Sequence, residues 1–377
     1  MAKHRDGPLK VLMINTVPMC YEGITTVMLN YAENMDRTGL QLDFLAINDV
    51  EESLRARIAV MGAQLYVIEG RNRHPLRYLR TLRRLIRANG YQVVHAHGNS
   101  CTLAVEMLAA RLGGARARCA HSHNTTCNSA LVHRLLRGPF EVCCTHRFAC
   151  GEAAGQWLFR DKPFAVLNNG IDAARYAFDS RSRAAHRARL GLEGRRVVGH
   201  VGSFNAQKNH AFLIEAFDDA ARRDPSLCLV LVGDGPTRPD IEAMVGERGL
   251  GDRVIFTGVS REVPGLLSAM DVMALPSRFE GLPNVVIEWQ AAGLPALVAD
   301  TVTPACRLTE LVRFLPLDAK AWTRALMETP VDADRAAASA GAAQAIAAAG
   351  YDIRDSAKRL RRLYFECAGL PLPPERG

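Results

Sequence analysis

The sequence is poor in long apolar runs and in aromatic residues. No stretch approaches roughly 18 consecutive apolar residues, so we expect no membrane-spanning helix. The first apolar run, at residues 11–14, is also too short for the core of a signal peptide. Aromatic side chains make up only 6% of the chain and do not alternate with its basic residues. We therefore expect no nucleic-acid partner, although a net charge of +8 favours nucleotides, phosphates or an acidic membrane.

The spacings typical of a metal site are missing as well. The ten cysteines include no Cys-x-x-Cys pair, and no Asp-x-Asp element follows a predicted strand to hold a divalent ion on a diphosphate. Cys143, Cys144 and Cys150 lie close together in sequence and are interpreted as buried core residues. Reduced thiols in the cytoplasm are the expectation for a chain of this kind. The sequence thus predicts neither a bound metal nor a cofactor.

Two pairs of histidines fall on predicted strands, His95 with His97 and His121 with His123. Residues two apart on a strand point to the same face, so each pair could in principle bind a metal. No cysteine or carboxylate cluster completes a ligand set in the sequence. We expect the histidines to line a crevice on the side of an acceptor, with simple packing as the alternative for His95.

The pattern of the chain indicates an α/β fold in two domains. Its 377 residues are 48% hydrophobic and 23% charged, which is a globular composition and suits two domains of about 150–200 residues. Short apolar runs alternate with helical stretches, which is typical of a parallel sheet covered on both faces. Strands are predicted at 10–14, 40–47, 64–68, 92–95, 116–121, 195–201, 227–232, 254–256, 272–275 and 296–299, and helices at 23–34, 77–88, 102–111, 211–222, 239–247, 263–270, 284–292 and 336–349.

The alternation restarts after a polar, arginine-rich stretch at 179–194. We therefore place a first Rossmann-like doubly wound domain at 1–178 and a second at 190–350. A last amphipathic helix, within 351–377, is expected to pack back on the first domain. Binding sites of such sheets lie beyond the C-terminal ends of their strands.

The segment from Pro276 to Pro295 carries the sharpest chemical signal. It follows a strand, turns through Glu280-Gly-Leu-Pro and opens a helix that should stop at Gly293. The free N–H groups at the start of that helix form an anion site. Glu280 and Glu288 suit hydrogen bonds from sugar hydroxyls better than contact with a phosphate. The alternative is a simple helix cap with a solvated glutamate.

Three further turns follow strands of the second domain. The first, from His200 to His210, carries Lys208, whose ammonium could neutralise a leaving phosphate. The others are Gly233-Asp-Gly and the turn from Thr257 to Ser260. Each alone is only a loop, and a lone loop lysine is usually solvated. All of them at the ends of parallel strands would line one crevice large enough for a nucleotide.

A basic stripe marks the helix predicted at 77–88. The arginines recur every three or four residues and so share one helical face, opposite a face of Leu76, Leu79, Leu82 and Ile86. Packing on a sheet explains the apolar face. The basic face is solvated, or it also binds an anionic membrane surface. The stripe consists of Arg73, Arg77, Arg80, Arg84 and Arg87.

These motifs resemble the retaining GT-B glycosyltransferases of family 4. The Glu-x7-Glu segment at 280–288 looks like the signature of that family. The segments at 120–124, 167–172, 200–210, 233–235 and 351–353 are similar to its further landmarks, in the same order. The likeness extends over nearly the whole chain, and the branch it most resembles contains bacterial exopolysaccharide and capsule transferases.

The resemblance implies a role for each matched residue. The donor would be a nucleotide sugar, with UDP expected from the branch, held by the second of two domains that face a central cleft. Glu288 would bind the ribose, Glu280 the transferred sugar and Lys208 the diphosphate, and His123 would lie close to the sugar. The other donor-binding positions implied are Gly23, Ser203, Gly233, Val259, Ser260, Gly281, Leu282 and Asn284, with His97 and His121 on the acceptor side.

One position departs from the family pattern. An arginine usually follows the glycine that corresponds to Gly202, and here that position is Ser203. The diphosphate then loses one of two cations, a loss that commonly costs about 10²–10³ in rate. Arg278 and Arg261 are candidates to replace it.

The mechanism that the resemblance implies needs no side-chain base. The C1–O bond of the donor breaks while Lys208 and the helix start stabilise the diphosphate. The acceptor hydroxyl attacks from the same face and gives its proton to the departing phosphate oxygen, so configuration is retained. The acceptor would be lipid-linked or an oligosaccharide. A sugar-nucleotide epimerase or phosphorylase, and a degenerate nucleotide-sugar-binding or scaffold protein without turnover, are the alternatives.

Overall fold

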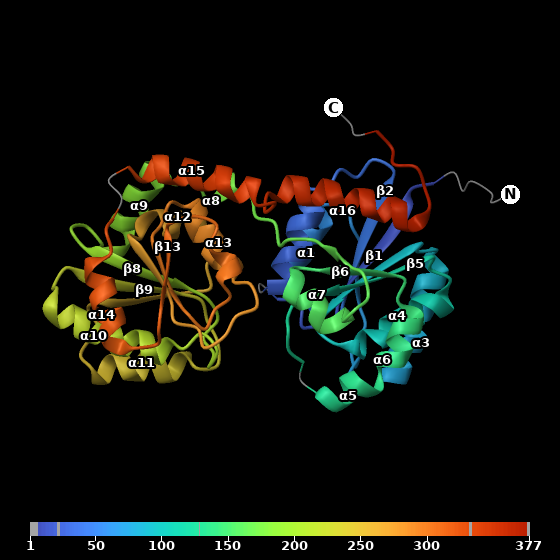
Figure 1. The fold of residues 1–377 in the computed structure, drawn as a ribbon, viewed down its shortest axis with the longest axis horizontal. Coiled ribbons are helices and arrows are strands. Elements are labelled where there is room, and N and C mark those ends of the chain that lie inside the picture. Colours follow the sequence, from blue (N-terminus) through green and yellow to red (C-terminus); the bar gives the residue numbers. More distant parts are fainter. Residues whose placement is uncertain (1–6, 21–22, 128, 332–333, 375–377) are drawn as a thin grey trace. The chain divides into compact units, whose positions relative to one another are not determined.

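The computed structural model describes residues 7–20, 23–127, 129–331 and 334–374. The chain divides into two compact units. The first comprises Met1–Gly170 with Gly350–Gly377, and the second comprises Ile171–Ala349 (Figure 1). Each unit is built around its own parallel sheet.

The sheet of the first unit contains seven strands within the described residues, in the order β3-β2-β1-β4-β5-β6-β7. All the pairings are parallel, and residues at odd positions of the central strands face one core while those at even positions face another. The strands are β1 (Leu9–Asn15), β2 (Leu40–Ala46), β3 (Leu65–Val67), β4 (Val93–Gly98), β5 (Ala117–Ser122), β6 (His146–Ala149) and β7 (Ala165–Val166).

Helices cover both faces of this sheet. The core on one face joins α1, α2 and α16 to the sheet, and the core on the other joins α3, α4, α6 and α7. Figure 1 shows α16, from the C-terminal end of the chain, running beside α1 from its beginning. The helices are α1 (Gly23–Glu33), α2 (Glu52–Val60), α3 (Pro75–Asn89), η1 (Cys101–Leu103), α4 (Ala104–Gly113), α5 (Ala130–Leu135), α6 (Arg137–Cys143), α7 (Glu152–Phe159) and α16 (Ile353–Ala368).

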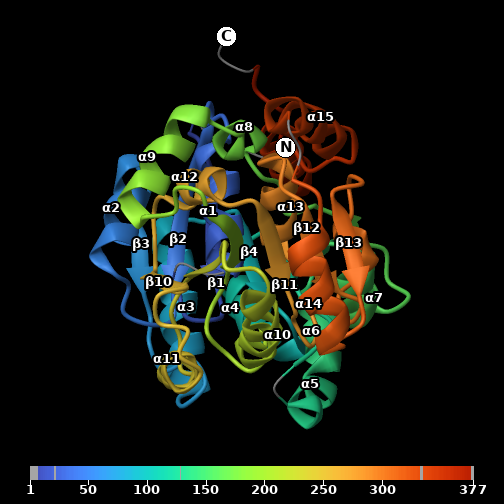
Figure 2. The ribbon, with the colours of Figure 1, turned by 90° about the vertical axis from the view of Figure 1, so that its left-hand side faces the viewer.

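The second unit has six strands among the described residues, in the order β10-β9-β8-β11-β12-β13. Figure 2 shows β10 and β13 at opposite edges, with β11 and β12 between them. Fully buried runs such as Leu227–Val232 form inner strands of the sheet, as is typical of parallel sheets that are covered on both faces. The strands are β8 (Arg196–Val201), β9 (Leu227–Val232), β10 (Val254–Gly258), β11 (Val272–Leu275), β12 (Ala296–Ala299) and β13 (Val312–Leu315).

Helices pack in two groups in this unit as well. In one group α10 contacts α11 and α14, and in the other α12 contacts α9 while α13 contacts α8 and α15. The helices are α8 (Ala173–Tyr176), α9 (Ser180–Leu190), α10 (His210–Arg223), α11 (Arg238–Glu247), α12 (Val263–Ala269), α13 (Asn284–Ala291), η2 (Pro304–Cys306), α14 (Ala319–Glu328) and α15 (Arg335–Ala348).

The predicted fold class is confirmed, and most predicted elements lie within two residues of those observed. The connection expected at 179–194 instead contains α9, which packs on α12. Arg183 and Arg187 of α9 bind the buried Asp271, so the arginine-rich stretch is anchored within the second unit. Residues 171–178, which the sequence placed in the first domain, also belong to the second unit. The predicted return of the last helix to the first unit is observed in α16.

No helix in the described part of the chain is both long enough and apolar enough to cross a membrane.

Candidate functional site

Five loops meet at the C-terminal edge of the second sheet. Backbone hydrogen bonds join the loops after β8, β9 and β10: Gly202 N donates to Val232 O, Phe204 N to Asp234 O, and Gly233 N to Gly258 O. The loop after β11 is joined to the loop after β8, because Arg278 N donates to Gln207 O and Gln207 Nε2 donates to Phe279 O. The loop after β12 joins through Thr301, whose hydroxyl donates to Ser277 O. The strand-end turns singled out in the sequence therefore form one surface.

The lysine and the first glutamate of the motifs contact each other on this surface. Lys208 Nζ lies 2.7 Å from Glu280 Oε1, and both side chains are mostly buried. The hydroxyl of Ser277 donates to the same Glu280 oxygen at 2.9 Å. Asn205 Oδ1 accepts from Lys208 N and fixes the backbone of the lysine loop. A cation thus lies beside a carboxylate that can accept hydrogen bonds from the hydroxyls of a sugar.

The start of α13 lies in the same loop as Glu280. Pro283 is the residue before the helix, with Gly281 exposed and Leu282 and Asn284 partly buried. Val286 and Trp289 of the helix and Ala292 just after it pack into the core of the unit, and Gln290 binds the η2 loop. Gly293 follows the helix at φ 65°, and a side chain there would clash with the backbone of α15. The helix boundaries predicted from Pro283 and Gly293 are confirmed to within a residue.

Glu288 lies one turn into α13 and is 9% exposed. Burial raises the pKa of Glu288 to about 7, although a hydrogen bond from Tyr176 and the nearby Arg175 lower it in part. Tyr176 comes from α8, a short helix that no pattern in the sequence predicts. A solvated surface glutamate does not usually have a pKa near neutral pH. Groups with such strongly shifted pKa values cluster at functional sites.

The turn at Gly233 and Gly235 needs glycine at both positions. A Cβ atom at Gly233 would lie 2.1 Å from Gly202 O, and one at Gly235 would lie 2.4 Å from Phe204 O. Their φ values of 139° and 155° are also unfavourable for other residues. The two glycines therefore let the loop after β9 approach the loop that carries Lys208.

Ser203 lies partly buried in the same loop as Lys208. Among the replacement cations, Arg278 is exposed and its Nε lies 3.4 Å from Asn209 Oδ1, next to Lys208 in the chain. Arg261 is exposed in the loop after β10. In that loop Val259 is 67% exposed, and Ser260 Oγ accepts from Glu262 N. The folded chain thus places Arg278 beside the lysine loop, a contact that the sequence alone does not predict.

The four histidines form a stack in the first unit. His97 Nδ1 lies 2.8 Å from His123 Nε2, and His95 Nε2 lies 3.2 Å from His121 Nδ1. His95 Nδ1 also lies 2.7 Å from the hydroxyl of Tyr364 on α16. Burial lowers the pKa of His123 to about 3 and holds those of His97 and His121 well below the usual range, so the rings are neutral.

His97 and His121 are fully buried, whereas His123 is partly exposed. The expectation that His97 and His121 face an acceptor is therefore wrong for this structure, in which they pack behind His123. Packing of His95 in the core, the alternative left open by the sequence, is confirmed.

Gly23 begins α1 beyond the end of β1, and no described atom lies within 4 Å of the place a Cβ would take.

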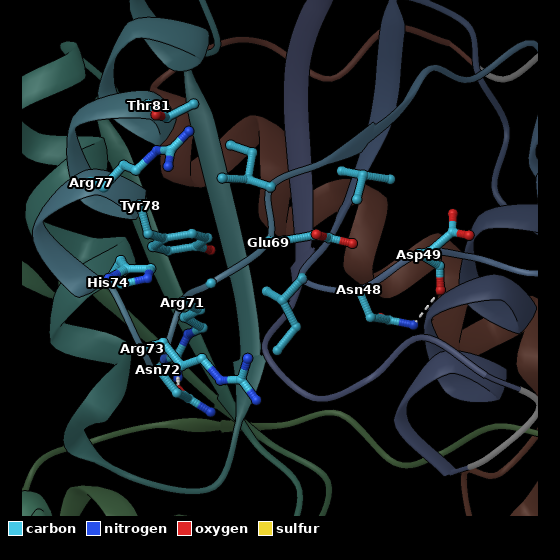
Figure 3. Close-up of a pocket in the computed structure, with 14 residues that line it drawn as sticks. Asn48, Asp49, Glu69, Arg71, Asn72, Arg73, His74, Arg77, Tyr78 and Thr81 are labelled. Atoms are coloured by element: carbon cyan, nitrogen blue, oxygen red, sulfur yellow. Dashed lines mark hydrogen bonds between the residues drawn. The ribbon is translucent and has the colours of Figure 1, made fainter.

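A pocket of about 870 Å³ lies at the C-terminal edge of the first sheet. The loops after β2 and β3 and the start of α3 line it, as Figure 3 shows. Arg73 and Arg77 supply positive charge, while Asp49 and Glu69 supply negative charge. Arg71 pairs with the buried Glu106 at 2.7 Å and thereby fixes the loop. The sequence motifs gave no sign of this pocket.

The arginines of the α3 stripe are all exposed, together with Arg83. None of these arginines forms an ion pair with another described residue, so their charges are uncompensated. The apolar face differs from the prediction. Leu76 is 68% exposed, and Tyr78 is buried instead, with Leu82 and Ile86. In the same unit, Leu131 and Leu135 of α5 are 67% and 68% exposed.

Two family profiles match the chain. The profile described as Glycosyltransferase Family 4 matches residues 21–175, and the one described as Glycosyl transferases group 1 matches residues 195–329. The chain is a member of the family 4 glycosyltransferases.

Individual relatives agree with this family. EpsF of Bacillus subtilis (strain 168), which its name assigns to the glycosyltransferases, is 33% identical over 299 residues, 74% of this chain and 77% of EpsF. The UDP-Gal:alpha-D-GlcNAc-diphosphoundecaprenol alpha-1,3-galactosyltransferase of Escherichia coli is 29% identical over 60% of this chain and 62% of its own length. The structure of HepE from Anabaena with UDP-glucose covers 95% of this chain and 99% of HepE, with a TM-score of 0.77 at 18% identity, and supports the GT-B fold.

Proposed function

We propose that this glycosyltransferase moves a hexose or N-acetylhexosamine from a UDP-sugar to a hydroxyl group of a lipid-linked or oligosaccharide acceptor in cell-surface polysaccharide synthesis. The observation that carries the proposal is the meeting of Lys208, Glu280 and the start of α13 on one surface of the second unit. Configuration is retained, and no metal or cofactor takes part.

The donor binds along the joined loops of the second sheet. The N–H groups of Gly281, Leu282 and Asn284 and the ammonium of Lys208 bind the diphosphate, and Glu280 turns from Lys208 to the hydroxyls of the sugar. Glu288 accepts from the ribose, and the backbone at Val259 and Ser260 reads the base. Gly233 gives this surface its shape, and Ser203 lies beside the diphosphate. The HepE structure with UDP-glucose supports UDP as the nucleotide.

Bond cleavage places negative charge on the diphosphate, where Lys208 and the helix start stabilise it. Removal of one such contact commonly costs about 10²–10³ in rate. The phosphate oxygen that leaves accepts the proton of the attacking hydroxyl, so no side chain acts as the base. From the first unit, the start of α1 at Gly23 approaches the donor, and the neutral ring of His123, held by His97, binds the sugar. A neutral ring can donate to a sugar hydroxyl without adding charge.

The acceptor binds in the pocket of the first unit. Arg73 and Arg77 on one wall suit a phosphate or diphosphate, and Asp49 and Glu69 on another suit sugar hydroxyls. The name of the Escherichia coli relative, whose acceptor is a sugar diphosphoundecaprenol, supports this class of acceptor. A lipid-linked acceptor must be reached at a membrane.

The basic stripe of α3 is the surface that we expect to bind the membrane. Its uncompensated arginines would each add about 1 kcal/mol of attraction to an anionic leaflet. The exposed Leu131 and Leu135 of α5 supply apolar contact in the same unit. We therefore propose a cytoplasmic enzyme bound peripherally at the inner face of the membrane.

A nucleotide-sugar-binding protein without turnover is the second candidate. Ser203 removes one expected cation, and Glu280 neutralises the other. Thermal-shift measurements with UDP-, GDP-, ADP- and dTDP-sugars separate the donors, and Glu288→Ala should abolish the stabilisation. Product formation with a lipid-linked acceptor, with the anomeric configuration read by NMR, then tests transfer. An inverted product would refute the mechanism, and binding without any product would favour the second candidate.

A further inference from the structure

Two thiols and one imidazole meet between the first sheet and α16. Cys119 lies on β5, His146 on β6 and Cys367 in the last turn of α16. One ligand atom from each of the three lies within 4.8 Å of the others. Cys119 and His146 are direct neighbours in the pairing of β5 with β6, so their side chains leave the sheet on the same face. That face is the one that α16 covers.

The contacts within the cluster are already those of neighbouring ligands. The thiols of Cys119 and Cys367 lie close enough to interact with each other, and the side chain of Cys367 also interacts with His146. Ligand atoms at the corners of a tetrahedral zinc site with Zn–S near 2.3 Å and Zn–N near 2.0 Å are roughly 3.5–3.8 Å apart. Because the three ligand atoms already lie within 4.8 Å of one another, closing the side chains by roughly 1 Å would bring the cluster to this spacing.

The second nitrogen of His146 is held by a neighbouring hydroxyl group. Thr145 Oγ1 lies 2.8 Å from His146 Nδ1, accepts from Arg118 N at 2.8 Å and donates to Arg118 O at 3.2 Å. With its proton committed to the carbonyl oxygen, the hydroxyl accepts from Nδ1–H, and Nε2 keeps its lone pair. Ligating histidines in metal sites are oriented in this way through their other nitrogen.

We propose that Cys119, His146 and Cys367 bind a zinc ion that fastens the end of α16 to the first sheet. Binding releases the two thiol protons, and two thiolates with a neutral imidazole balance the charge of Zn²⁺. The thiolate ligands select a soft ion over Mg²⁺ or Ca²⁺. Cys367 and His146 are partly exposed, so water can supply the fourth ligand. The zinc holds the fold together and takes no part in sugar transfer.

The neighbouring histidine group is a poorer site. His95, His97 and His121 also lie close together. Both nitrogens of His95 are already hydrogen-bonded, to Tyr364 and to His121, so this ring offers no lone pair without breaking a buried contact. The group also lacks a thiolate to balance a dication in a fully buried place.

Cobalt is a direct probe of this site because its thiolate complexes absorb light. The full-length chain, purified under reducing conditions and stripped with a chelator, is titrated with Co²⁺. We expect one cobalt per chain, a thiolate-to-cobalt charge-transfer band, and loss of that band when Zn²⁺ is added. Cys119→Ser and Cys367→Ser should each abolish the band. Cys150→Ser is the matched control, because Cys150 is a buried thiol in the core on the opposite face of the same sheet.

The substitution Thr145→Val distinguishes a metal site in which His146 is oriented by the protein from adventitious binding of cobalt by the two thiols. It leaves all three ligands in place but removes the partner of His146, and should weaken cobalt binding about 10-fold or more. Circular dichroism shows whether each variant is folded. The proposal is overturned if the reduced, folded chain gives no band, if the band survives Cys367→Ser, or if Thr145→Val binds cobalt as tightly as the parent. Isolation of the chain with Cys119 and Cys367 joined in a disulfide, and no cobalt binding after reduction, would also overturn it.

Discussion

Lys208 and Glu280 form an ion pair of 2.7 Å between two strand-end loops of the second unit, and Ser277 donates to the same carboxylate. In the proposed reaction these two groups serve different parts of the donor. A diphosphate must therefore compete with Glu280 for the ammonium, and the sugar must replace the ammonium on Glu280. Before the donor binds, each of the two side chains neutralises the other.

Glu280→Gln should separate binding from turnover. Loss of the carboxylate frees Lys208, so UDP is expected to bind several-fold more tightly while kcat falls about 10²-fold or more. Calorimetry with UDP and steady-state rates with the donor measure the two effects. Glu310→Gln, at a highly exposed carboxylate, is the control and should change neither. Weaker UDP binding in Glu280→Gln would show that the carboxylate does not compete for Lys208.

Arg278 is expected to replace the cation missing at Ser203. Arg278→Ala should lower kcat about 10-fold, less than Lys208→Ala, because the arginine is exposed and its charge is screened. Adding Ser203→Arg to Arg278→Ala should restore most of the rate. Arg313→Ala, at an exposed arginine of β13, serves as the control. If Ser203→Arg restores nothing, the cation is supplied by another group or is not needed.

The fold could be predicted from the sequence because buried parallel strands are continuous apolar runs. For this reason the apolar run at Leu227–Val232 predicts its strand to the residue. The strand His146–Ala149 begins with polar residues and is only four residues long, so it gave no such signal. Helix α9 is not apparent in the sequence, because Arg183 and Arg187, which bind the buried Asp271, look like the arginines of a solvated segment.

Individual residues of the candidate site and a shared crevice can be predicted from the sequence, but the contacts between its loops cannot. Spacing along the chain placed Glu280 before α13 and Glu288 inside it. The pairing of Lys208 with Glu280 depends on how two loops meet after folding, and no local pattern encodes it. The same holds for Cys119, His146 and Cys367, which come together through strand register and the return of α16.

The α3 stripe should control binding to acidic vesicles. Arg80→Ala with Arg84→Ala removes two exposed charges and should weaken binding by about 2 kcal/mol, roughly 30-fold, at low salt. Co-sedimentation with vesicles of increasing anionic lipid content measures the effect, which should vanish on neutral vesicles. Arg362→Ala, an exposed arginine on α16, is the control. Sedimentation that does not depend on acidic lipid would contradict the proposed membrane contact.

Glu288 should make the stability of the second unit depend on pH. Its pKa is raised from 4.5 to about 7, so the folded chain binds the proton more tightly than the unfolded chain. Stability from this group is therefore fully present below about pH 4.5, falls as the pH rises, and is about 3 kcal/mol lower above pH 7. Glu288→Gln removes the titrating group and keeps an acceptor for Tyr176. The variant should melt at a higher temperature than the parent at pH 8 and at nearly the same temperature at pH 5.

The carboxyl group of Glu288 should also couple donor binding to the release of a proton. Ribose hydroxyls donate to the ionised form, so UDP binding below pH 7 should release a proton from Glu288. Calorimetry at pH 6.5 in two buffers of different ionisation enthalpy measures that release, and UDP affinity should rise from pH 6 to pH 8. Glu288→Gln should bind UDP more weakly, without proton release. A parent protein whose UDP binding neither releases protons nor varies with pH would show that the nucleotide does not meet this carboxylate.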